Sequence, residues 1–346
     1  MLVREEVLLA PYTTLGIGGP ARWFVEATDE KQVVEAVRLA REKNAPLFVL
    51  GGGSNLLVAD EGFPGVVLHV ALKGIEQNGN LFRAAAGENW DGFVSMAIER
   101  GFGGIECLAG IPGTVGGTPV QNVGAYGQEV SSTIVAVRVL DVKSLNYSEL
   151  PAATCGFSYR RSILNSTHRD RFVVTRVDYR LRPNAFPVLQ YPDLKKHFQG
   201  RTGIPSLQEA ADAVREIRRS KGMLLVEGDA DSHSAGSFFR NPVIGQAAYD
   251  GIVAKAKGPV PQFPATAGMV KIPAAWLVEQ SGFHKGFALG AAGISSRHTL
   301  ALINRGGAAA ADIAALRDLI VGTVEKRFGI HLEPEPVWLG PAAVRP

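Results

Sequence analysis

The sequence is short of cysteine, and this excludes several classes of protein. Its 346 residues contain only two cysteines, Cys107 and Cys155. Two are too few for a disulfide framework, and no CxxC pair or Cys/His cluster has the spacing of a metal site. We therefore expect no bound metal, two buried apolar thiols and a location in the reducing cytoplasm.

Long apolar runs and blocks of like charge are also missing. No stretch reaches the roughly 18 apolar residues of a transmembrane helix. The opening MLVREEVLLAPY has acids where a secretory signal carries basic and then apolar residues. Lys+Arg 36 against Asp+Glu 33 gives a net charge of only +3, which argues against nucleic acid as a partner. With 46% hydrophobic and 20% charged residues, we expect a soluble globular protein that is not bound to a membrane.

Glycine, by contrast, is abundant. The chain has 40 glycines, about 12% against the roughly 7% that is usual. They gather at 51–53, 101–117 and 124–127. A chain without Cβ can approach a ligand closely and point several backbone N–H groups at one anion. One such triplet is as readily a structural turn, but three clusters favour a single extended anionic ligand.

Two common phosphate loops do not fit the first cluster. A Walker loop ends in Gly-Lys-Ser/Thr, whereas Leu56, Leu57 and Val58 follow Ser54-Asn55 here. The Rossmann fingerprint fails because neither Gly51-x-Gly53 nor Gly101-x-Gly103 is completed by glycine three residues later. Composition leaves FAD and other nucleotides open as the ligand.

Strand and helix signals alternate along the chain. Asp29, with Gln32 three residues later, predicts the start of one helix. The capping box from Ser206 to Glu209 predicts the start of another, which runs through Arg219. Further helices are expected at 90–100, 274–280 and 311–328, with a polar, turn-rich segment at 222–234. Strands are expected at 23–27, 47–50, 56–58, 66–70, 81–86, 133–141 and 172–181. Helical spacing groups Val33, Val34, Val37 and Ala40 on one face, and likewise Ile313, Leu316, Leu319, Ile320, Val324 and Phe328.

Five motifs follow one another along the chain: GGGSNLLV (51–58), AGIPGTVGGTPVQNVGAYGQEV (109–130), CGFSYRRSIL (155–164), AGSFFRNP (235–242) and LEPE (332–335). Together they resemble the UDP-N-acetylenolpyruvoylglucosamine reductases (UDP-N-acetylmuramate dehydrogenases), flavoenzymes of bacterial peptidoglycan synthesis. The resemblance spans nearly the whole chain. It implies an α+β and α/β multidomain fold, with a vanillyl-alcohol-oxidase (PCMH)-type FAD-binding domain in two lobes and a C-terminal α/β substrate-binding domain.

The resemblance also implies a domain division. Residues 1–70 would form the first FAD-binding lobe, and 71–221 the second, including a tyrosine loop. Residues 222–329 would bind the UDP-sugar, and 330–346 would return to the active site. A monomer is expected.

The implied reaction is the reduction of UDP-N-acetylenolpyruvoylglucosamine to UDP-N-acetylmuramate, with NADPH as co-substrate and non-covalent FAD. A hydride passes from flavin N5 to the vinyl carbon, and a proton reaches the neighbouring carbon. Ser237 matches the family's proton donor, while Arg160 and Glu335 match the residues that stabilise the enolate. Outside these motifs, Ser237 would be interpreted as a turn serine, Arg160 as a solvated arginine and Glu335 as a surface glutamate. Their neighbours Arg161 and Glu333 are expected to be such solvent-facing residues.

The resemblance carries over further contacts. Substrate-binding residues would be Tyr159, Arg160, Tyr191, Lys221 and Asn241, and the Tyr191 segment is typical of the subclass with a tyrosine loop. The cofactor would be held mostly through backbone N–H groups, and Ile111 and Val115 would offer apolar contact. A Cβ added at Gly52 or Gly116 would therefore lower the affinity for flavin before it lowered the stability of the fold. The cofactor-binding residues would be Gly51, Gly52, Gly53, Ser54, Asn55, Gly110, Ile111, Gly113, Thr114, Gly116, Gly117, Asn122, Gly124, Ala125 and Tyr126.

Two departures and two alternatives stand beside this interpretation. Ala288 replaces a glutamine found in many relatives, and 222–234 lacks the expected Leu-Pro-Asp-Pro. One alternative is another FAD enzyme of the same fold, although no histidine lies in the glycine clusters to bind flavin covalently. The other is a non-catalytic nucleotide-sugar sensor. His298 and His331 show no metal or triad spacing and are expected at ordinary surface or strand positions.

Overall fold

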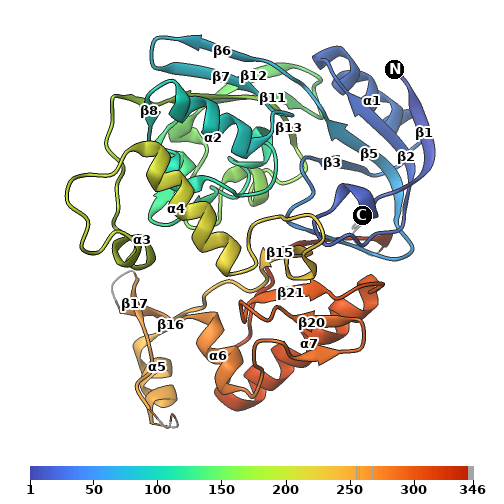
Figure 1. The fold of residues 1–346 in the computed structure, drawn as a ribbon. Helices are drawn as coiled ribbons and strands as arrows, with labels where there is room; N and C mark the ends of the chain where they lie inside the picture. Colours follow the sequence, from blue (N-terminus) through green and yellow to red (C-terminus); the bar gives the residue numbers. More distant parts are fainter. Residues whose placement is uncertain (255, 257, 266–267, 342–346) are drawn as a thin grey trace. The chain divides into compact units, whose positions relative to one another are not determined.

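The chain folds into two compact units, each built from separate stretches of sequence (Figure 1). The computed structural model describes residues 1–254, 256, 258–265 and 268–341. Unit 1 comprises Met1–Leu8, Pro20–Gly53 and Phe63–Ser220, and unit 2 comprises Leu9–Gly19, Ser54–Gly62 and Lys221–Pro346. Across the described residues, no helix is both long and apolar enough to cross a membrane.

The first sheet of unit 1 has four strands in the order β1-β2-β5-β3 (Val3–Leu8, Pro20–Ala27, Phe63–Val70, Leu47–Leu50). β2, β5 and β3 are parallel, and β1 is an antiparallel edge strand. α1 (Glu30–Glu42) links β2 to β3 and packs on β2 and β5. Asp29 Oδ1 accepts the Gln32 amide at 2.8 Å, as expected of its cap.

The second sheet of unit 1 is antiparallel, in the order β12-β11-β13-β7-β6 (Tyr147–Pro151, Ile134–Asp141, Phe172–Arg180, Leu81–Ala85, Ile75–Asn78). Beside it lie α2 (Trp90–Glu99) and α4 (Leu207–Ser220), which contact each other. Trp90, Phe93 and Tyr179 form an aromatic centre, with ring centroids 5.1 to 6.0 Å apart. This packing fixes the start of α2, where the Trp90 amide donates to the carbonyl of Gly113 at 3.1 Å.

Unit 2 holds a sheet in the order β15-β21-β20-β19 (Ser234–Ser237, Ala301–Asn304, Ala292–Ile294, Ala288–Leu289). α7 (Ala310–Phe328) packs on β20, β21 and α6 (Ala274–Gln280). A smaller sheet, β16-β18-β17 (Val243–Gly245, Met269–Lys271, Phe263–Pro264), lies next to α5 (Gln246–Val253). β4 (Leu56–Val58) pairs in parallel with β22 (Val337–Leu339), so residues 54–62 belong to this unit.

The predicted elements are confirmed, with small shifts at their ends. β2 and β5 begin earlier than predicted, at Pro20 and Phe63, and α7 begins at Ala310. The Ser206 capping box forms as predicted, with Ser206 N–H donating to Glu209 Oε2 at 2.8 Å. One residue of the predicted faces was wrongly assigned, because Leu319 is 43% exposed. On α1, Val34 is half-buried and packs against the core as its spacing predicts, and Ala36 is fully buried beside it. The division into three functional regions stays a prediction.

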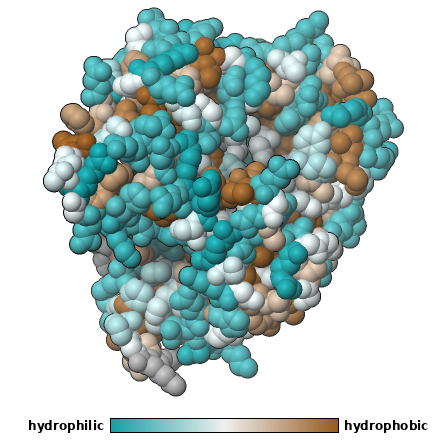
Figure 2. All heavy atoms as spheres, in the orientation of Figure 1, coloured by the Kyte–Doolittle hydropathy of each residue, from teal (hydrophilic) through white to brown (hydrophobic). Residues whose placement is uncertain are grey.

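Polar side chains dominate the face of the molecule drawn in Figure 2. The residues that it colours as hydrophobic form small, separate patches among hydrophilic ones. On this face the coloured residues therefore form no broad apolar patch of the kind that marks a permanent protein interface.

Asp60 provides a test of how residues 54–62 support unit 2. Its two carboxylate oxygens accept the amides of Ala310 and Ala311 at 2.7 and 3.1 Å, at the start of α7. Asp60→Ala removes this cap and should lower the free energy of unfolding by about 1 kcal/mol. The expected result is a lower urea midpoint for the full chain. Glu61→Ala, at the exposed neighbouring position, is the control, and an equal loss in both variants would contradict the capping role.

Candidate functional site

Two of the glycine clusters meet in unit 1. An ideal Cβ on Gly52 would lie 2.5 Å from Gly113 Cα, and one on Gly51 would lie 2.9 Å from Thr114 Oγ1. Gly53 and Gly113 have φ of 61° and 129°, which favour glycine. Within the described chain, the amides of Gly51, Gly52 and Gly53 donate no hydrogen bond. These three adjacent N–H groups can therefore serve an anionic ligand.

The second glycine loop is fastened to the start of α2. The backbone amide of Trp90 donates to Gly113 O at 3.1 Å, and its indole Nε1–H donates to Leu108 O at 3.0 Å. The amides of Gly116 and Gly117 donate to carbonyls of the chain at 2.8 and 3.0 Å. Because these amides are already bonded to the chain, Gly116 and Gly117 are exceptions to the expectation that most cradle glycines act through N–H.

Charged side chains hold Gly110 from both sides. Asp91 Oδ1 accepts its amide at 2.7 Å, and Arg218 Nε donates to its carbonyl at 2.9 Å. Arg215 Nη2 donates to the same Asp91 oxygen at 2.8 Å, so this carboxylate connects the loop to α4. Burial lowers the pKa of Arg218, and the nearby Tyr126 and Asp91 oppose that shift. Because its amide is bonded to Asp91, Gly110 helps to fix the conformation of the loop.

The protein itself leaves no room for a methyl group at two of the glycines. A Cβ on Gly52 meets Gly113 as described, and one on Gly116 would lie 2.6 Å from Ala86 Cβ. Because the clash is with the chain, these distances argue against the expectation that such changes would cost flavin affinity before fold. Gly117 differs, because it is exposed and an added Cβ would meet nothing within 4 Å.

Arg160 lies on a turn beside the third glycine cluster, also in unit 1. Its φ is 54°, a strained value for a residue with a side chain, and Asn165 Nδ2 donates to its carbonyl at 3.1 Å. Its Nη1 donates to Gly124 O at 2.9 Å. Arg160 is half-buried, whereas Tyr159 and Arg161 are exposed. The turn thus directs one guanidinium inward, at Arg160 as predicted.

Asn122 joins this turn to the hairpin of β9 (Gly124–Ala125) and β10 (Gln128–Glu129). The buried side chain donates through Nδ2 to Glu129 Oε2 at 2.8 Å and to Ser158 O at 3.1 Å. Its Oδ1 accepts the Ser131 amide at 3.1 Å. Both polar atoms of this side chain are bonded to other residues of the chain, so Asn122 helps to fix the conformation of the site.

Tyr191 packs against the same hairpin. It stands at the start of α3 (Pro192–His197) and is 40% exposed. Its ring meets that of Tyr126 edge-on, with centroids 5.2 Å apart. Tyr126, with φ of 48°, also hydrogen-bonds Arg218. Unit 1 therefore brings Tyr126, Tyr191, Gly110 and Gly124 into one neighbourhood.

In unit 2, Ser237 and Glu335 lie on adjoining backbone. Ser237 ends β15, paired with Ala301, and is half-buried. The amide of Glu335 donates to the carbonyl of Phe238, the next residue, at 2.8 Å. Asn55 Nδ2 donates to Glu335 O at 3.3 Å, which brings the end of the first glycine motif to the same place. Glu333 is exposed, as expected.

Asn241 is partly used by the fold. Its Oδ1 accepts the amide of Ala274, the first residue of α6, at 2.9 Å. Its Nδ2 is therefore the group suited to a ligand. Ala288, where a glutamine was expected, is exposed on β19.

His298 differs from the expectation of an ordinary surface or strand position. Burial, with the positive charges of Lys221 and Lys285, lowers its pKa to about 4. Its Nδ1 accepts the Leu300 amide at 3.1 Å, so the neutral ring carries its proton on Nε2. His331, as expected, is exposed and pairs with Glu325 at 3.2 Å.

Several residues of the site escaped prediction. Asp91, Arg215 and Arg218 support the glycine loop, and His298 lies among lysines distant in sequence. No local motif announces such pairs, because they form only when the chain has folded. The motif GGGSN is itself divided, with Gly51–Gly53 in unit 1 and Ser54-Asn55 in unit 2.

Comparison with known proteins agrees with this geometry. The model of the FAD binding domain matches residues 21–144, which places the chain among flavoproteins with the predicted fold class. The model described as UDP-N-acetylenolpyruvoylglucosamine reductase, C-terminal domain, matches residues 229–339. The chain belongs to the UDP-N-acetylenolpyruvoylglucosamine reductase family and is an oxidoreductase.

Individual relatives extend over the whole chain. The reductase of Thermobifida fusca is 45% identical, covering 97% of this chain and 98% of its own length. That of Streptomyces coelicolor is 44% identical, covering 96% and 89%. The crystal structure of the reductase from Thermus caldophilus matches with a TM-score of 0.69 and 27% identity, covering 98% of this chain and all of the other.

The glycine contacts give a matched pair of variants. Gly52→Ala places a methyl group against Gly113 and should lower the free energy of unfolding by roughly 1–3 kcal/mol. Gly117→Ala meets no atom and should stay within about 0.5 kcal/mol of wild type. Thermal unfolding at saturating FAD measures both, and equal midpoints for the two variants would contradict the packing.

His298 predicts a pH dependence of stability. The unfolded imidazole has a pKa of about 6.5, and the folded one about 4. Above the unfolded pKa both states are neutral. As the pH falls toward 4, the unfolded chain takes up a proton that the folded chain refuses, so stability decreases. From pH 7 to 5 we expect wild type to lose roughly 1–2 kcal/mol more than His298→Gln. Urea midpoints at both pH values measure this, and parallel losses would refute it.

Proposed function

We propose that this chain catalyses the NADPH-dependent reduction of UDP-N-acetylenolpyruvoylglucosamine to UDP-N-acetylmuramate, a step of peptidoglycan synthesis. Relatives that carry the reductase name match nearly its full length. The observation that carries the proposal is the backbone bond from Glu335 to Phe238, which joins Glu335 to the residue that follows Ser237 in unit 2. Both candidate residues for proton transfer thus lie on hydrogen-bonded backbone of the same unit.

FAD is the proposed resident cofactor, and the glycine loops fit the diphosphate of such a group. The adjacent amides of Gly51–Gly53 and the touching loop at Gly113-Thr114 support this fit. When bound, FAD would supply the two-electron chemistry by delivering a hydride to the substrate double bond. Gly110, Gly116, Gly117 and Asn122 would keep the loops in shape, and half-buried Ile111 would offer apolar contact. Val115 is wholly buried in the core, so the expected apolar contact is assigned to Ile111 alone.

The chain's own residues would stabilise the charge that develops on the substrate. The Arg160 guanidinium would hold the substrate carboxylate, a task suited to a planar, permanently charged fork. The Ser237 hydroxyl would give its proton to the carbon that bears this carboxylate. Because an alcohol is a weak acid, the resulting alkoxide needs stabilisation by neighbours, and Glu335 would support the same proton transfer.

The nucleotide diphosphate would be bound by other groups. Lys221 would supply positive charge, and Asn241 would donate through Nδ2, since its Oδ1 is bonded to α6. Tyr191 and the exposed Tyr159 would complete the substrate contacts. The packing of Tyr191 on Tyr126 supports membership of the subclass with a tyrosine loop. We also propose that the enzyme is a cytoplasmic monomer with the three functional regions at 1–70, 71–221 and 222–329.

Anaerobic stopped-flow absorbance tests the function and the role of Ser237 together. In wild type, NADPH should bleach the flavin, and UDP-N-acetylenolpyruvoylglucosamine, unlike UDP-N-acetylglucosamine, should restore its colour. In Ser237→Ala the bleaching should persist, while recolouring slows by about 10²-fold or more because the proton donor is gone. Ser281→Ala, at the end of α6 in unit 2 and outside the proposed site, is the control. Recolouring at the normal rate in Ser237→Ala would remove the assigned role, and no recolouring in wild type would refute the function.

A further inference from the structure

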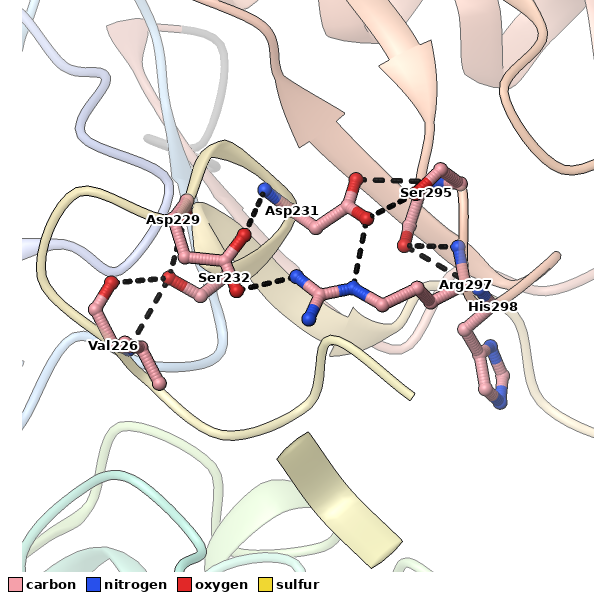
Figure 3. A network of polar contacts seen from close by, with 8 residues as sticks. Val226, Asp229, Asp231, Ser232, Ser295, Arg297 and His298 are labelled. Carbon is pink, nitrogen blue, oxygen red and sulfur yellow. Dashed lines mark hydrogen bonds and ion pairs between the residues drawn. The ribbon is translucent and has the colours of Figure 1, made fainter. Parts of the chain in front are cut away.

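The turn-rich segment 222–234 is held by a polar network centred on Arg297 (Figure 3). Arg297 Nε donates to Asp231 Oδ2 at 2.9 Å, and its Nη2 pairs with Asp229 Oδ2. Ser296 reinforces the contact, because its hydroxyl and amide donate to Asp231 at 2.6 and 3.1 Å. One guanidinium thus connects the turn at 229–232 to the turn at 295–298.

Each of these two turns is also ordered internally. Ser232 Oγ donates to the carbonyls of Val226 and Asp229 at 3.0 and 2.8 Å. On the other turn, the buried Ser295 accepts the amides of Arg297 and His298 on its Oγ at 3.0 and 3.3 Å. Arg297 therefore joins two turns that have defined conformations of their own.

The network reaches Lys221 through the next residue, Gly222. With φ of 65°, Gly222 packs so closely that an added Cβ would lie 3.2 Å from Ser295 Oγ and 3.3 Å from Arg297 Nε. His298 follows Arg297 directly and is close enough to Lys221 for that charge to lower its pKa. The network therefore packs against the residue that follows Lys221 and bonds the amide of His298.

Arg297 is poorly suited to bind an anion itself. Two carboxylates already face its guanidinium, so the group of three carries a net negative charge. Its value to overall stability is also small, because ion pairs with side chains 13% to 29% exposed, as here, contribute about 0–1 kcal/mol. The network is thus better explained by the placement of its neighbours than by charge or global stability.

We propose that Arg297, clamped by Asp229 and Asp231, is a positioning residue that sets Lys221 for the diphosphate of the nucleotide-sugar. The proposal rests on the function proposed above. It assigns a task to the segment 222–234, whose sequence departs from the expected family pattern.

Steady-state kinetics of the FAD-loaded full chain test the clamp. Arg297→Met should raise the KM for UDP-N-acetylenolpyruvoylglucosamine at least tenfold, while flavin bleaching by NADPH stays within twofold of wild type. Arg297→Lys should fall between, since an ammonium can retain one ion pair. Arg305→Met is the matched control, because that arginine lies in the same unit and donates to Gly290 O at 2.9 Å, away from the network. An unchanged KM in Arg297→Met would overturn the proposal.

A second variant separates positioning from direct binding. Asp229→Asn combined with Asp231→Asn keeps Arg297 but removes both negative charges. Positioning predicts a raised KM, as in Arg297→Met, whereas a direct anion ligand would bind more tightly once freed, and a lowered KM would overturn the proposal. Isothermal titration calorimetry with UDP measures the effect of the clamp on diphosphate affinity independently of turnover. If the wild type binds UDP but does not reduce the substrate, the proposed function fails. The clamp is then still supported by at least tenfold weaker UDP binding in Arg297→Met. Equal UDP binding by the two proteins refutes the clamp.

Discussion

The close packing of two glycine loops in unit 1 is the constraint on which the proposed cofactor site depends. Gly52 lies so close to Gly113 that it has no space for a side chain. The loop carrying Gly113 must therefore be held from behind, and the first residue of α2 does this through both its backbone and its indole nitrogen. Trp90 is in turn fixed by the aromatic centre of the core. The amides at 51–53 owe their position to this series of contacts.

Charged side chains serve a similar purpose in both units. In unit 1, Asp91 bonds a loop amide and Arg215 together, and in unit 2, Asp229 and Asp231 bind Arg297. In each case a carboxylate and an arginine hold a turn in place. A chain with a net charge of +3 can accommodate anionic ligands in this way.

The parts of the structure predicted from sequence are those determined by neighbouring residues. The caps at Asp29 and Ser206 form as their spacing predicts, and the glycine clusters mark real turns with positive φ at Gly53, Gly110 and Gly113. What each glycine does could not be predicted in this way. Gly110 and Gly116 have amides that are satisfied by Asp91 and Ala86, residues that reach them only through the fold.

The same limit applies to residues whose behaviour depends on distant charge. His298 follows an ordinary-looking Ser-Ser-Arg, and nothing near it in sequence indicates that two lysines and burial will keep its ring neutral. By contrast, Ser237, Arg160 and Glu335 were recognisable because each lies in an extended motif. Motifs identify residues, whereas the ionisation and orientation of those residues depend on the folded environment.

The segment 222–234 shows how one chain can replace a rigid sequence with a network of contacts. The expected Leu-Pro-Asp-Pro would stiffen the loop, because each proline restricts φ and lowers the entropy lost on folding. This segment has no proline and carries two glycines with positive φ, Gly222 and Gly228, which increase backbone freedom in the unfolded chain. Ion pairs to Arg297 act on the folded state, so they can restore order to the loop without restoring the lost chain stiffness. Order that depends on charge is screened by salt, whereas order imposed by a proline ring is not, and the two kinds of loop therefore differ in how they respond to ionic strength.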